Sequence, residues 1–349
     1  MNRRRTYILF ILLCMMSLGL AGCASKWALQ TESSKAPPQW PDHTGETRIK
    51  HLMTIAGFEQ VGTSLPNIVQ YIVFGRAGDN LINRPVAAAV GKDERLAIAD
   101  TGCRCVHLYI PAEHKYLKLY TTGSDEMRSP VGLTFDDELR LYVSDSGRSA
   151  IDVFDGRGAF VFSLKKAGDA PLKRPTGLTY SSKKKIVYAV DSLAHTIYAF
   201  NTKGDFLFSF GERGNKNGQL NFPTHIDSSP SGQLYITDTM NFRIQSFDSS
   251  GRFLSSFGRH GDGSGDFAMP KGVAVDNAGV IYVVDGLFDN IQLFNGKGDF
   301  LLTVGGRGNG HGEFWLPSGI FLDDHDKLYV CDTYNKRLQV FQIMRDRHE

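Results

Sequence analysis

Residues 234–247 read LYITDTMNFRIQSF, and residues 328–341 read LYVCDTYNKRLQVF. In both stretches an alternating apolar segment ends at an aspartate and a threonine, and a second apolar segment follows an Asn-x-Arg sequence. Short alternating segments on either side of a polar turn are typical of a β-hairpin. The recurrence of one hairpin pattern predicts that the chain contains an internal repeat.

Four anchors recur in register six times along the chain, at spacings of 45 to 48 residues. Each copy begins with a proline, at Pro85, Pro130, Pro175, Pro223, Pro270 and Pro317. An aspartate follows 15 or 16 residues later, at Asp100, Asp145, Asp191, Asp238, Asp285 and Asp332. An aliphatic residue follows each aspartate by six residues and an aromatic residue follows it by nine. Chance does not place four anchors in register six times.

Each copy contains four short apolar segments separated by Gly, Asn or Asp, such as GVAVD, VIYVVD, NIQLF and DFLLTVG in the fifth. Four antiparallel strands in every ~45 residues, without helical periodicity, are typical of one propeller blade. A single blade cannot bury both of its faces, so neighbouring blades stack around a ring. The sequence therefore predicts an all-β fold, a six-bladed β-propeller with four-stranded antiparallel blades. The six aspartates are interpreted as braces of their turns.

The pattern Pro-x-Gly-(Ile/Val)-x-x-Asp, followed by Val-x-Asp-Thr-x-Asn-x-Arg-(Ile/Leu)-Gln-x-Phe, resembles the NHL repeat. The resemblance covers about residues 85–341 and is specific in the last three copies and looser in the first three. It implies a six-bladed β-propeller. It also implies a binding platform, because NHL propellers are mostly binding proteins, with a minority of related propellers acting as lyases or lactonases.

Closure of the ring requires one more strand. The sixth copy ends at Phe341, and the remaining QIMRDRHE is too short and polar to form an outer strand. An N-terminal strand is expected to close the ring and remove its open edge. Residues 47–57 (TRIKHLMTIAG) and 64–75 (SLPNIVQYIVFG) both qualify. We predict the closing strand at 48–56, a helical turn at 66–74, and a propeller domain over residues 48–344.

The N-terminal residues are typical of a targeting sequence. Residues 1–22 contain three arginines, an apolar run from Tyr7 to Leu20 and small residues, which is the layout of a secretory signal peptide. The sequence Leu20-Ala21-Gly22-Cys23 resembles a bacterial lipobox and predicts a covalent acyl lipid on Cys23; an ordinary signal that contains a cysteine is the alternative. The resemblance to bacterial lipoproteins implies that a chain without Asp after Cys23 is sorted to the outer membrane of a Gram-negative cell. The polar, proline-containing residues 23–47 are expected to form a flexible tether.

Charge and cysteine usage limit the partners. Loss of the signal removes three arginines and no acids, so Lys+Arg falls from 39 to 36 against 37 Asp+Glu, a formal charge of −1. Nucleic acid is not expected as a partner, because the basic footprint that it requires is missing.

Cys103, Cys105 and Cys331 remain after loss of the signal and lipidation of Cys23, so at least one of the three is free or pairs with another molecule. One disulfide or buried thiols are expected, with redox activity or metal binding at Cys103 and Cys105 as the alternative.

One copy departs from the others at its first strand. Residues two and four after each proline share a side of the innermost strand, and here the fourth copy has His225 and Asp227 where the others have small or apolar residues or threonine. We expect both to face the channel mouth beside Thr134 and Thr179. Such a pair could bind a metal, polarise a ligand or transfer protons, or simply contact channel water.

An enzyme remains the second hypothesis. A zinc lyase requires several converging histidines, and only His225 occupies such a position. A calcium lactonase requires several inward carboxylates or amides, and Asp227 stands alone in these positions. The sequence leaves open whether the channel binds a metal or a small ligand.

The turns between strands 2 and 3 carry apolar residues in the last three copies, where polar residues are usual. These are Met240, Phe242, Leu287, Phe288 and Tyr334. The loops before the same copies add Arg213, Arg259 and Arg307. Exposed apolar patches with aromatic, Met and Arg residues mark interaction sites, while packing between turns is the alternative. The expected function is a lipid-anchored envelope protein that docks another exported or outer-membrane protein, and resemblance to known lipoproteins suggests an electron-transfer or secretion component.

Overall fold

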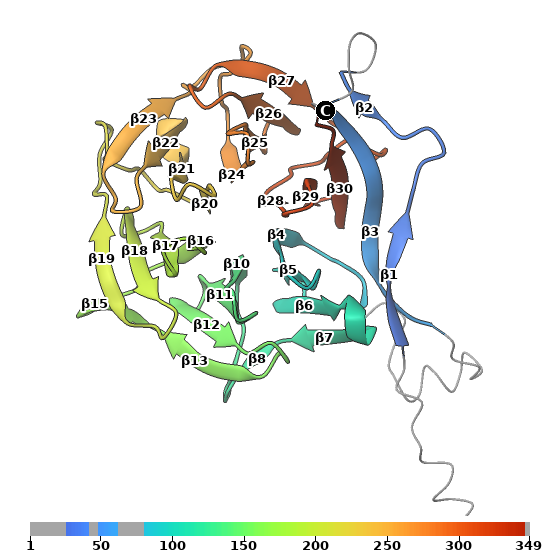
Figure 1. The fold of residues 1–349 in the computed structure, drawn as a ribbon, viewed down its shortest axis with the longest axis horizontal. Helices are drawn as coiled ribbons and strands as arrows, with labels where there is room; N and C mark the ends of the chain where they lie inside the picture. The colour runs from blue at the N-terminus through green and yellow to red at the C-terminus, as the bar shows by residue number, and fades with distance from the viewer. Residues whose placement is uncertain (1–25, 42–47, 62–79, 346–349) are drawn as a thin grey trace, which may run out of the picture.

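A computed structural model describes residues 26–41, 48–61 and 80–345. These residues form six blades arranged in a ring about a common axis (Figure 1). The described helical segments are 3-10 turns of three residues, η2 (Pro111–Glu113) and η3 (Thr239–Asn241). The all-β fold with six antiparallel blades is confirmed.

Blades 1 to 5 each contain four antiparallel strands in chain order, with the first strand innermost (Figure 1). Blades 1 and 2 are β4 (Pro85–Val90), β5 (Leu96–Asp100), β6 (Cys105–Ile110), β7 (Lys115–Leu119) and β10 (Pro130–Phe135), β11 (Leu141–Asp145), β12 (Ala150–Phe154), β13 (Phe160–Leu164). Blades 3 to 5 are β16 (Pro175–Ser181), β17 (Ile186–Asp191), β18 (Thr196–Asn201), β19 (Phe206–Phe210); β20 (Ile226–Ser228), β21 (Leu234–Asp238), β22 (Arg243–Phe247), β23 (Phe253–Phe257); and β24 (Pro270–Val275), β25 (Ile281–Asp285), β26 (Asn290–Phe294), β27 (Phe300–Val304). Two small hairpins, β8 (Thr121–Thr122) with β9 (Asp125–Glu126) and β14 (Lys166–Ala167) with β15 (Ala170–Pro171), lie between blades.

Blade 6 joins the two ends of the chain. Its inner strands are β28 (Ile320–Leu322), β29 (Lys327–Asp332) and β30 (Arg337–Ile343), and its outer strand is the N-terminal β3 (Ile49–Val61). Strand β3 pairs antiparallel with β30, with Ile49 opposite Ile343 and Ile55 opposite Leu338. The predicted closing strand at 48–56 is therefore confirmed, and it is longer than predicted.

Part of the predicted tether is ordered, which corrects the prediction of flexibility over 23–47. Strand β1 (Lys26–Glu32) pairs with β3 along its whole length, and β2 (Gln39–Trp40) pairs with the start of β3. The physical reason is that β3 leaves an edge open for pairing, and the Trp27 ring packs against Tyr116 at a centroid distance of 5.0 Å. The signal peptide, Cys23 and the predicted helical turn at 66–74 lie outside the described residues. Among the described residues, no helix is long and apolar enough to span a membrane.

The repeated aspartates connect two kinds of loop on one face of the ring. We call this face the top face; it is formed by the 2–3 turns within blades and by the 4–1 loops, which lead from one outer strand to the next inner strand. All six aspartates are completely buried. In blade 2, for example, Asp145 accepts hydrogen bonds from the backbone N–H of Arg128 (2.7 Å) and Ser129 (2.9 Å) in the 4–1 loop and of Gly147 (3.0 Å) in the turn. The aspartates are structural braces, as predicted.

Candidate functional site

The structure brings the four predicted channel residues together. His225, Asp227, Thr179 and Thr134 all line one cavity at the centre of the ring, among the inner strands of the blades. The cavity has a volume of about 50 Å³, enough for one or two water molecules. Small-molecule sites usually need roughly 300 to 1,000 Å³, so this cavity does not hold a substrate of ordinary size.

Asp227 connects three blades. Its carboxylate accepts hydrogen bonds from the backbone N–H of Ser228 (2.8 Å) in its own blade and of Val275 (2.9 Å) in blade 5, and the Thr179 hydroxyl of blade 3 lies 3.4 Å away. Burial raises its pKa to about 6, although these hydrogen bonds oppose the shift. A carboxylate with several fixed donors in a small cavity acts as a brace for the ring.

His225 is held in its uncharged form. Burial, assisted by the charge of Lys271, lowers its pKa to about 3. Its Nδ1 atom lies 3.0 Å from the Thr224 hydroxyl and forms a hydrogen bond with it. A pKa near 6 would suit the Asp227 carboxyl for acid–base chemistry, but a cavity of this size leaves no room beside it for a substrate of ordinary size.

The titration of Asp227 leads to a testable pH dependence. Its pKa in the folded state, about 6, exceeds its usual value of 3.8. The contribution of Asp227 to the unfolding free energy is therefore fully present below the unfolded pKa, and it is lost as pH rises through the folded pKa. Relative to an Asp227→Asn variant, which does not titrate here, the wild-type protein should lose up to about 3 kcal/mol of unfolding free energy between about pH 4 and pH 7. Urea unfolding of both proteins across this range measures the difference. If the unfolding free energies of the two proteins changed in parallel with pH, Asp227 would have the same pKa in the folded and unfolded states, which would contradict the prediction.

The 2–3 turns of blades 3 to 6 expose apolar side chains on the top face. The second residue after the buried aspartate points to solvent in each turn, with exposed fractions of 44% for Leu193, 53% for Met240, 60% for Leu287 and 45% for Tyr334. Trp315, in the 4–1 loop before blade 6, is 45% exposed and lies 5.7 Å from the Tyr334 ring. We call these five residues the top-face patch. Sequence reasoning missed Leu193 and Trp315, although Leu193 stands at the same register as Met240.

Phe242 and Phe288 differ from the prediction. Both are half-buried, because the fourth and third residues after the aspartate turn back toward the blade. Phe242 has a positive φ of 55° and packs edge-on against the His260 ring at 4.5 Å, above the apolar cluster between blades 4 and 5. Phe242 is therefore a packing residue, and the interpretation of this side chain as a freely exposed anchor is corrected.

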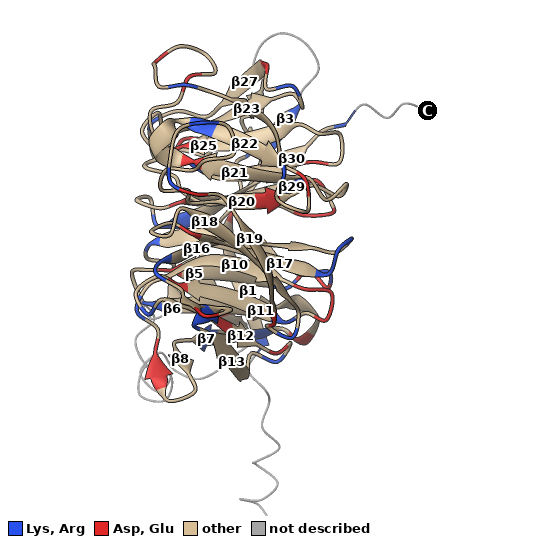
Figure 2. Ribbon diagram, turned by 90° about the vertical axis from the view of Figure 1, so that its left-hand side faces the viewer, with Lys and Arg blue, Asp and Glu red and all other residues tan. Residues whose placement is uncertain are grey.

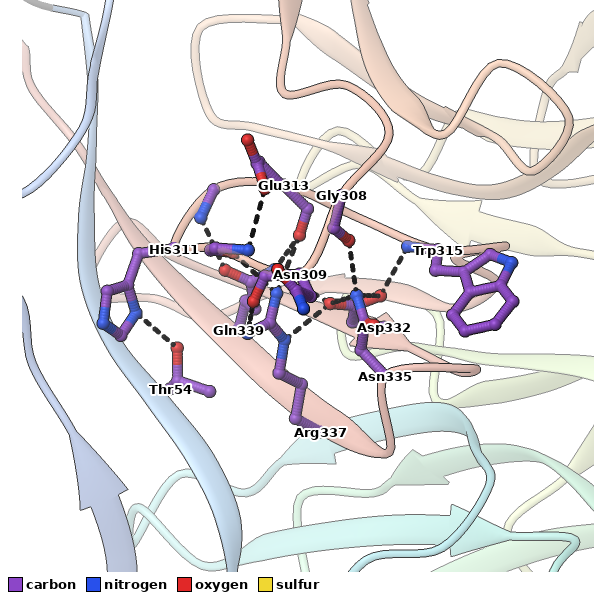
Figure 3. Close-up of polar contacts among 12 residues, drawn as sticks. Thr54, Gly308, Asn309, His311, Glu313, Trp315, Asp332, Asn335, Arg337 and Gln339 are labelled. Carbon is purple, nitrogen blue, oxygen red and sulfur yellow. Dashed lines mark hydrogen bonds and ion pairs between the residues drawn. The ribbon is translucent and has the colours of Figure 1, made fainter.

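A buried polar network fixes the loop that carries Trp315 and the turn that carries Tyr334 (Figure 3). Asp332 accepts hydrogen bonds from Arg337 Nε (2.7 Å), Gln339 Nε2 (3.0 Å) and the backbone N–H of Trp315 (2.8 Å). The remaining guanidinium nitrogens of Arg337 donate to the carbonyl oxygens of residues 309, 310 and 313 in the 4–1 loop. The loop with Trp315 and the turn with Tyr334 are thereby held together.

Comparison with known proteins agrees with this architecture. The family described as "6-bladed beta-propeller" matches residues 225–288 and 277–345. A gluconolactonase structure from Xanthomonas campestris superposes with a TM-score of 0.59 and 17% identity, over 90% of this chain and 99% of that chain. None of the curated proteins matches the sequence.

Two further structures have the same arrangement of blades. A catalytically inactive virginiamycin B lyase from Staphylococcus aureus with quinupristin gives a TM-score of 0.57 at 14% identity, over 75% of this chain and 96% of that chain. An auxiliary nutrient binding protein from Bacteroides ovatus gives 0.57 at 15% identity, over 76% and 71%. The chain is a six-bladed β-propeller. At these identities the similarity shows the fold alone, and propellers of this shape include both binding proteins and enzymes.

The propeller carries its predicted loop arginines on three successive blades. Arg213, Arg259 and Arg307 are exposed in the 4–1 loops that follow β19, β23 and β27. Arg259 pairs with Asp266 at 2.7 Å. Each of the three arginines lies in a different 4–1 loop.

Basic residues also occupy the other half of the top face. The 4–1 loops before blades 1 to 3 expose Arg84, Arg128, Lys173 and Arg174 just ahead of the inner strands. The Arg84 guanidinium lies 5.5 Å from the centroid of the Tyr334 ring, which is within cation–π distance. The same loops also expose Asp125, Glu126 and Asp169, so basic and acidic residues are interspersed here as they are elsewhere in the described propeller (Figure 2).

Potential metal ligands converge at one place among the described residues. Cys103, Cys105 and His107 in blade 1 place their donor atoms within 4.8 Å of one another. Cys103 and Cys105 form a disulfide, while Cys331 is a buried free thiol. In the channel, by contrast, His225 and Asp227 are accompanied by threonines and apolar residues.

Proposed function

We propose that this propeller is a lipid-anchored docking protein of the bacterial envelope. The acyl lipid on Cys23 would attach it to the outer membrane, and the top-face patch would hold another exported or outer-membrane protein. The observation that carries the proposal is the exposure of an apolar side chain at one register position in four successive blades, beside Trp315.

The composition of the top-face patch supports a protein interface. Large exposed apolar groups that gather on one face mark interaction sites. Tyr, Trp and Arg are the residues that most often carry binding energy at interfaces, and here Trp315, Tyr334 and Arg84 form one contiguous group. The buried network behind them pre-organises this group, which reduces the entropy lost on binding.

Other exposed apolar side chains serve as a comparison. Leu207, Leu254 and Leu301 are 44%, 43% and 50% exposed, but each lies on the outer strand of its own blade. The outer strands are separated by the width of a blade (Figure 1). These leucines resemble the patch in exposure and differ from it in position, which makes them matched controls.

The channel gives less support to the alternative of a lyase- or lactonase-like enzyme. A cavity of about 50 Å³ around the Asp227 carboxylate and the His225 imidazole offers too little volume for a substrate of ordinary size. The docking role is therefore the function that the geometry supports best.

Site-specific photo-crosslinking in cells tests the docking role. A photoreactive residue at Leu287 or Tyr334 should crosslink one discrete exported protein, whereas the same residue at Leu207 or Leu254 should not. With that partner purified, Leu287→Ser combined with Tyr334→Ser should weaken binding at least about 30-fold, as expected for loss of interface hot spots, with an unchanged melting temperature. Leu254→Ser should leave the affinity unchanged.

Two outcomes would contradict the proposal. Equal crosslinking from the outer strands would show that the top face has no special role. A Cys23→Ser variant that stays in the membrane fraction would remove the lipid anchor from the proposal, because the acyl chains on Cys23 are expected to provide the attachment.

A further inference from the structure

Blade 1 replaces the buried polar network of its sister blades with sulfur and imidazole. In blade 6, residues three, five and seven after Asp332 are Asn335, Arg337 and Gln339, and all three donate to its carboxylate. Blade 4 repeats this arrangement around Asp238. At the same register after Asp100, blade 1 has Cys103, Cys105 and His107.

In blade 1 the side chains of Asp100, Cys103, Cys105 and His107 form one group of contacts. Cys103 and Cys105 are joined by a disulfide. The Nε2 atom of His107 lies 3.7 Å from each Sγ atom and 3.4 Å from Asp100 Oδ2, and its Nδ1 atom lies 2.8 Å from the Tyr116 hydroxyl. The Nδ1 atom of the imidazole thus has a hydrogen-bond partner in Tyr116, and the Nε2 atom faces both the Asp100 carboxylate and the disulfide.

The turn does not require this disulfide. In all six blades the fourth residue after the aspartate has a positive φ, between 53° and 58°, and the residues are Arg104, Ser149, His195, Phe242, Asp289 and Lys336. Five of these turns adopt the same conformation without cysteines. A crosslink between residues two apart also closes a very short loop, which restricts the unfolded chain less than a long one does. A purely structural role therefore explains little about this pair.

Access to the two sulfur atoms is unequal. Cys105 and His107 are completely buried, whereas Cys103 is partly exposed on the top face. Behind them the Phe58 ring from β3 stacks on His107 at 5.3 Å and on Tyr116 at 4.3 Å. Arg84 and Arg104 are exposed beside the turn, and their positive charge favours the approach of a thiolate. An incoming thiolate can reach Cys103 but not Cys105.

We propose that Cys103 and Cys105 form a redox-active pair that exchanges with dithiols presented to the top face. The thiolate sulfur attacks Cys103 Sγ, a mixed disulfide forms, the Cys103–Cys105 bond breaks, and its electron pair passes to Cys105 Sγ. The proton that the incoming thiol has lost returns through the His107 imidazole to Cys105. The second thiol of the dithiol then loses its proton and its sulfur attacks the sulfur of the dithiol that is bound to Cys103. The mixed disulfide breaks, its electron pair passes to Cys103 Sγ, and Cys103 takes up the released proton. The dithiol is thus oxidised to a disulfide, and the pair is reduced to two thiols.

Native-state reduction of the purified full-length protein tests this inference. With dithiothreitol as the dithiol, alkylation and mass spectrometry should show that Cys103 and Cys105 become reduced and labelled while the buried Cys331 stays unlabelled. The matched variant is His107→Gln, because glutamine occupies this register in blades 4, 5 and 6. This variant should be reduced at least about 10-fold more slowly than the wild type. That effect is smaller than the factor of about 100 or more that a positioned proton donor typically contributes. The melting temperature of the oxidised protein should not fall.

Trapping experiments identify the attacked sulfur. Oxidised glutathione should form a stable mixed disulfide with Cys103 in a Cys105→Ser variant, and should not react with Cys105 in a Cys103→Ser variant. Reduced ribonuclease, offered in place of dithiothreitol, should become oxidised if protein dithiols are the substrates. Reaction with dithiothreitol alone would assign small dithiols.

Three results would overturn the inference. The first is a rate of reduction of the Cys103–Cys105 disulfide that is no higher in the native protein than in the protein unfolded in urea. The second is equal trapping at both cysteines. The third is stoichiometric metal bound by Cys103 and Cys105 as thiolates in the purified protein, which would make the cluster a metal site.

Discussion

Deletion of residues 26–61 is expected to abolish cooperative folding of the propeller. These residues supply β3, the outer strand of blade 6, which pairs with β30. They also bury Ile49, Ile55 and Phe58, each at most 3% exposed, and burial of such side chains stabilises by about 1.5 to 3 kcal/mol each. Their combined loss approaches the entire stability of a typical domain, about 5 to 15 kcal/mol, and it also leaves β30 as an open edge.

Circular dichroism and denaturant unfolding of the deletion protein provide the measurement. The control is a shorter deletion of residues 26–41, which removes β1 and β2 but keeps β3. This protein should remain folded, with reduced stability, because it exposes Tyr116 where Trp27 now packs. A cooperative unfolding transition in the longer deletion would show that blades 1 to 5 close without the N-terminal strand.

The repeated anchors of the sequence predicted most of the fold. Each blade is determined by local features of its own copy. These are a proline near the inner strand, an aspartate at the 2–3 turn and the alternating segments between them, so each blade could be predicted from its own residues. The closing strand was also predictable, because residues 47–57 (TRIKHLMTIAG) have the residue pattern of a strand. Strand β1 was not, because its residues are half-exposed and its pairing depends on an edge of β3 that exists only in the assembled ring.

The candidate sites were only partly predictable. The alternation of side chains at the start of the fourth copy predicted that His225 and Asp227 face the same way, and both line the central cavity. The hydrogen bond from the Val275 N–H of blade 5 to Asp227 depends on how two blades pack, which no single copy encodes. By contrast, the register that aligns His107 with Gln245 and Gln339 is present in the sequence, so comparison of the copies could have identified the blade 1 cluster.

Replacement of Asp332 by alanine is expected to cost about 3 to 5 kcal/mol of unfolding free energy. Its carboxylate is fully buried, and the Arg337 side chain that it binds is only 13% exposed. Removal of one partner from a buried ion pair leaves the other charge uncompensated, which is strongly destabilising. Burial also raises the pKa of Asp332 despite the hydrogen bonds from Trp315, Asn335 and Arg337, so the carboxylate depends on these donors to remain charged.

A solvent-exposed ion pair separates this effect from simple loss of a charge pair. Arg252 binds Asp248 at 3.1 Å, and the two side chains are 79% and 29% exposed, so this pair should contribute little to stability. Urea unfolding should therefore show a large loss for Asp332→Ala and almost none for Arg252→Ala. Because Asp332 also holds the loop of Trp315 against the turn of Tyr334, Asp332→Ala should weaken partner binding even where the protein remains folded. Equal stability of the two variants would mean that the network does not hold the top face together, and that the rigidity assigned to the top-face patch has another source.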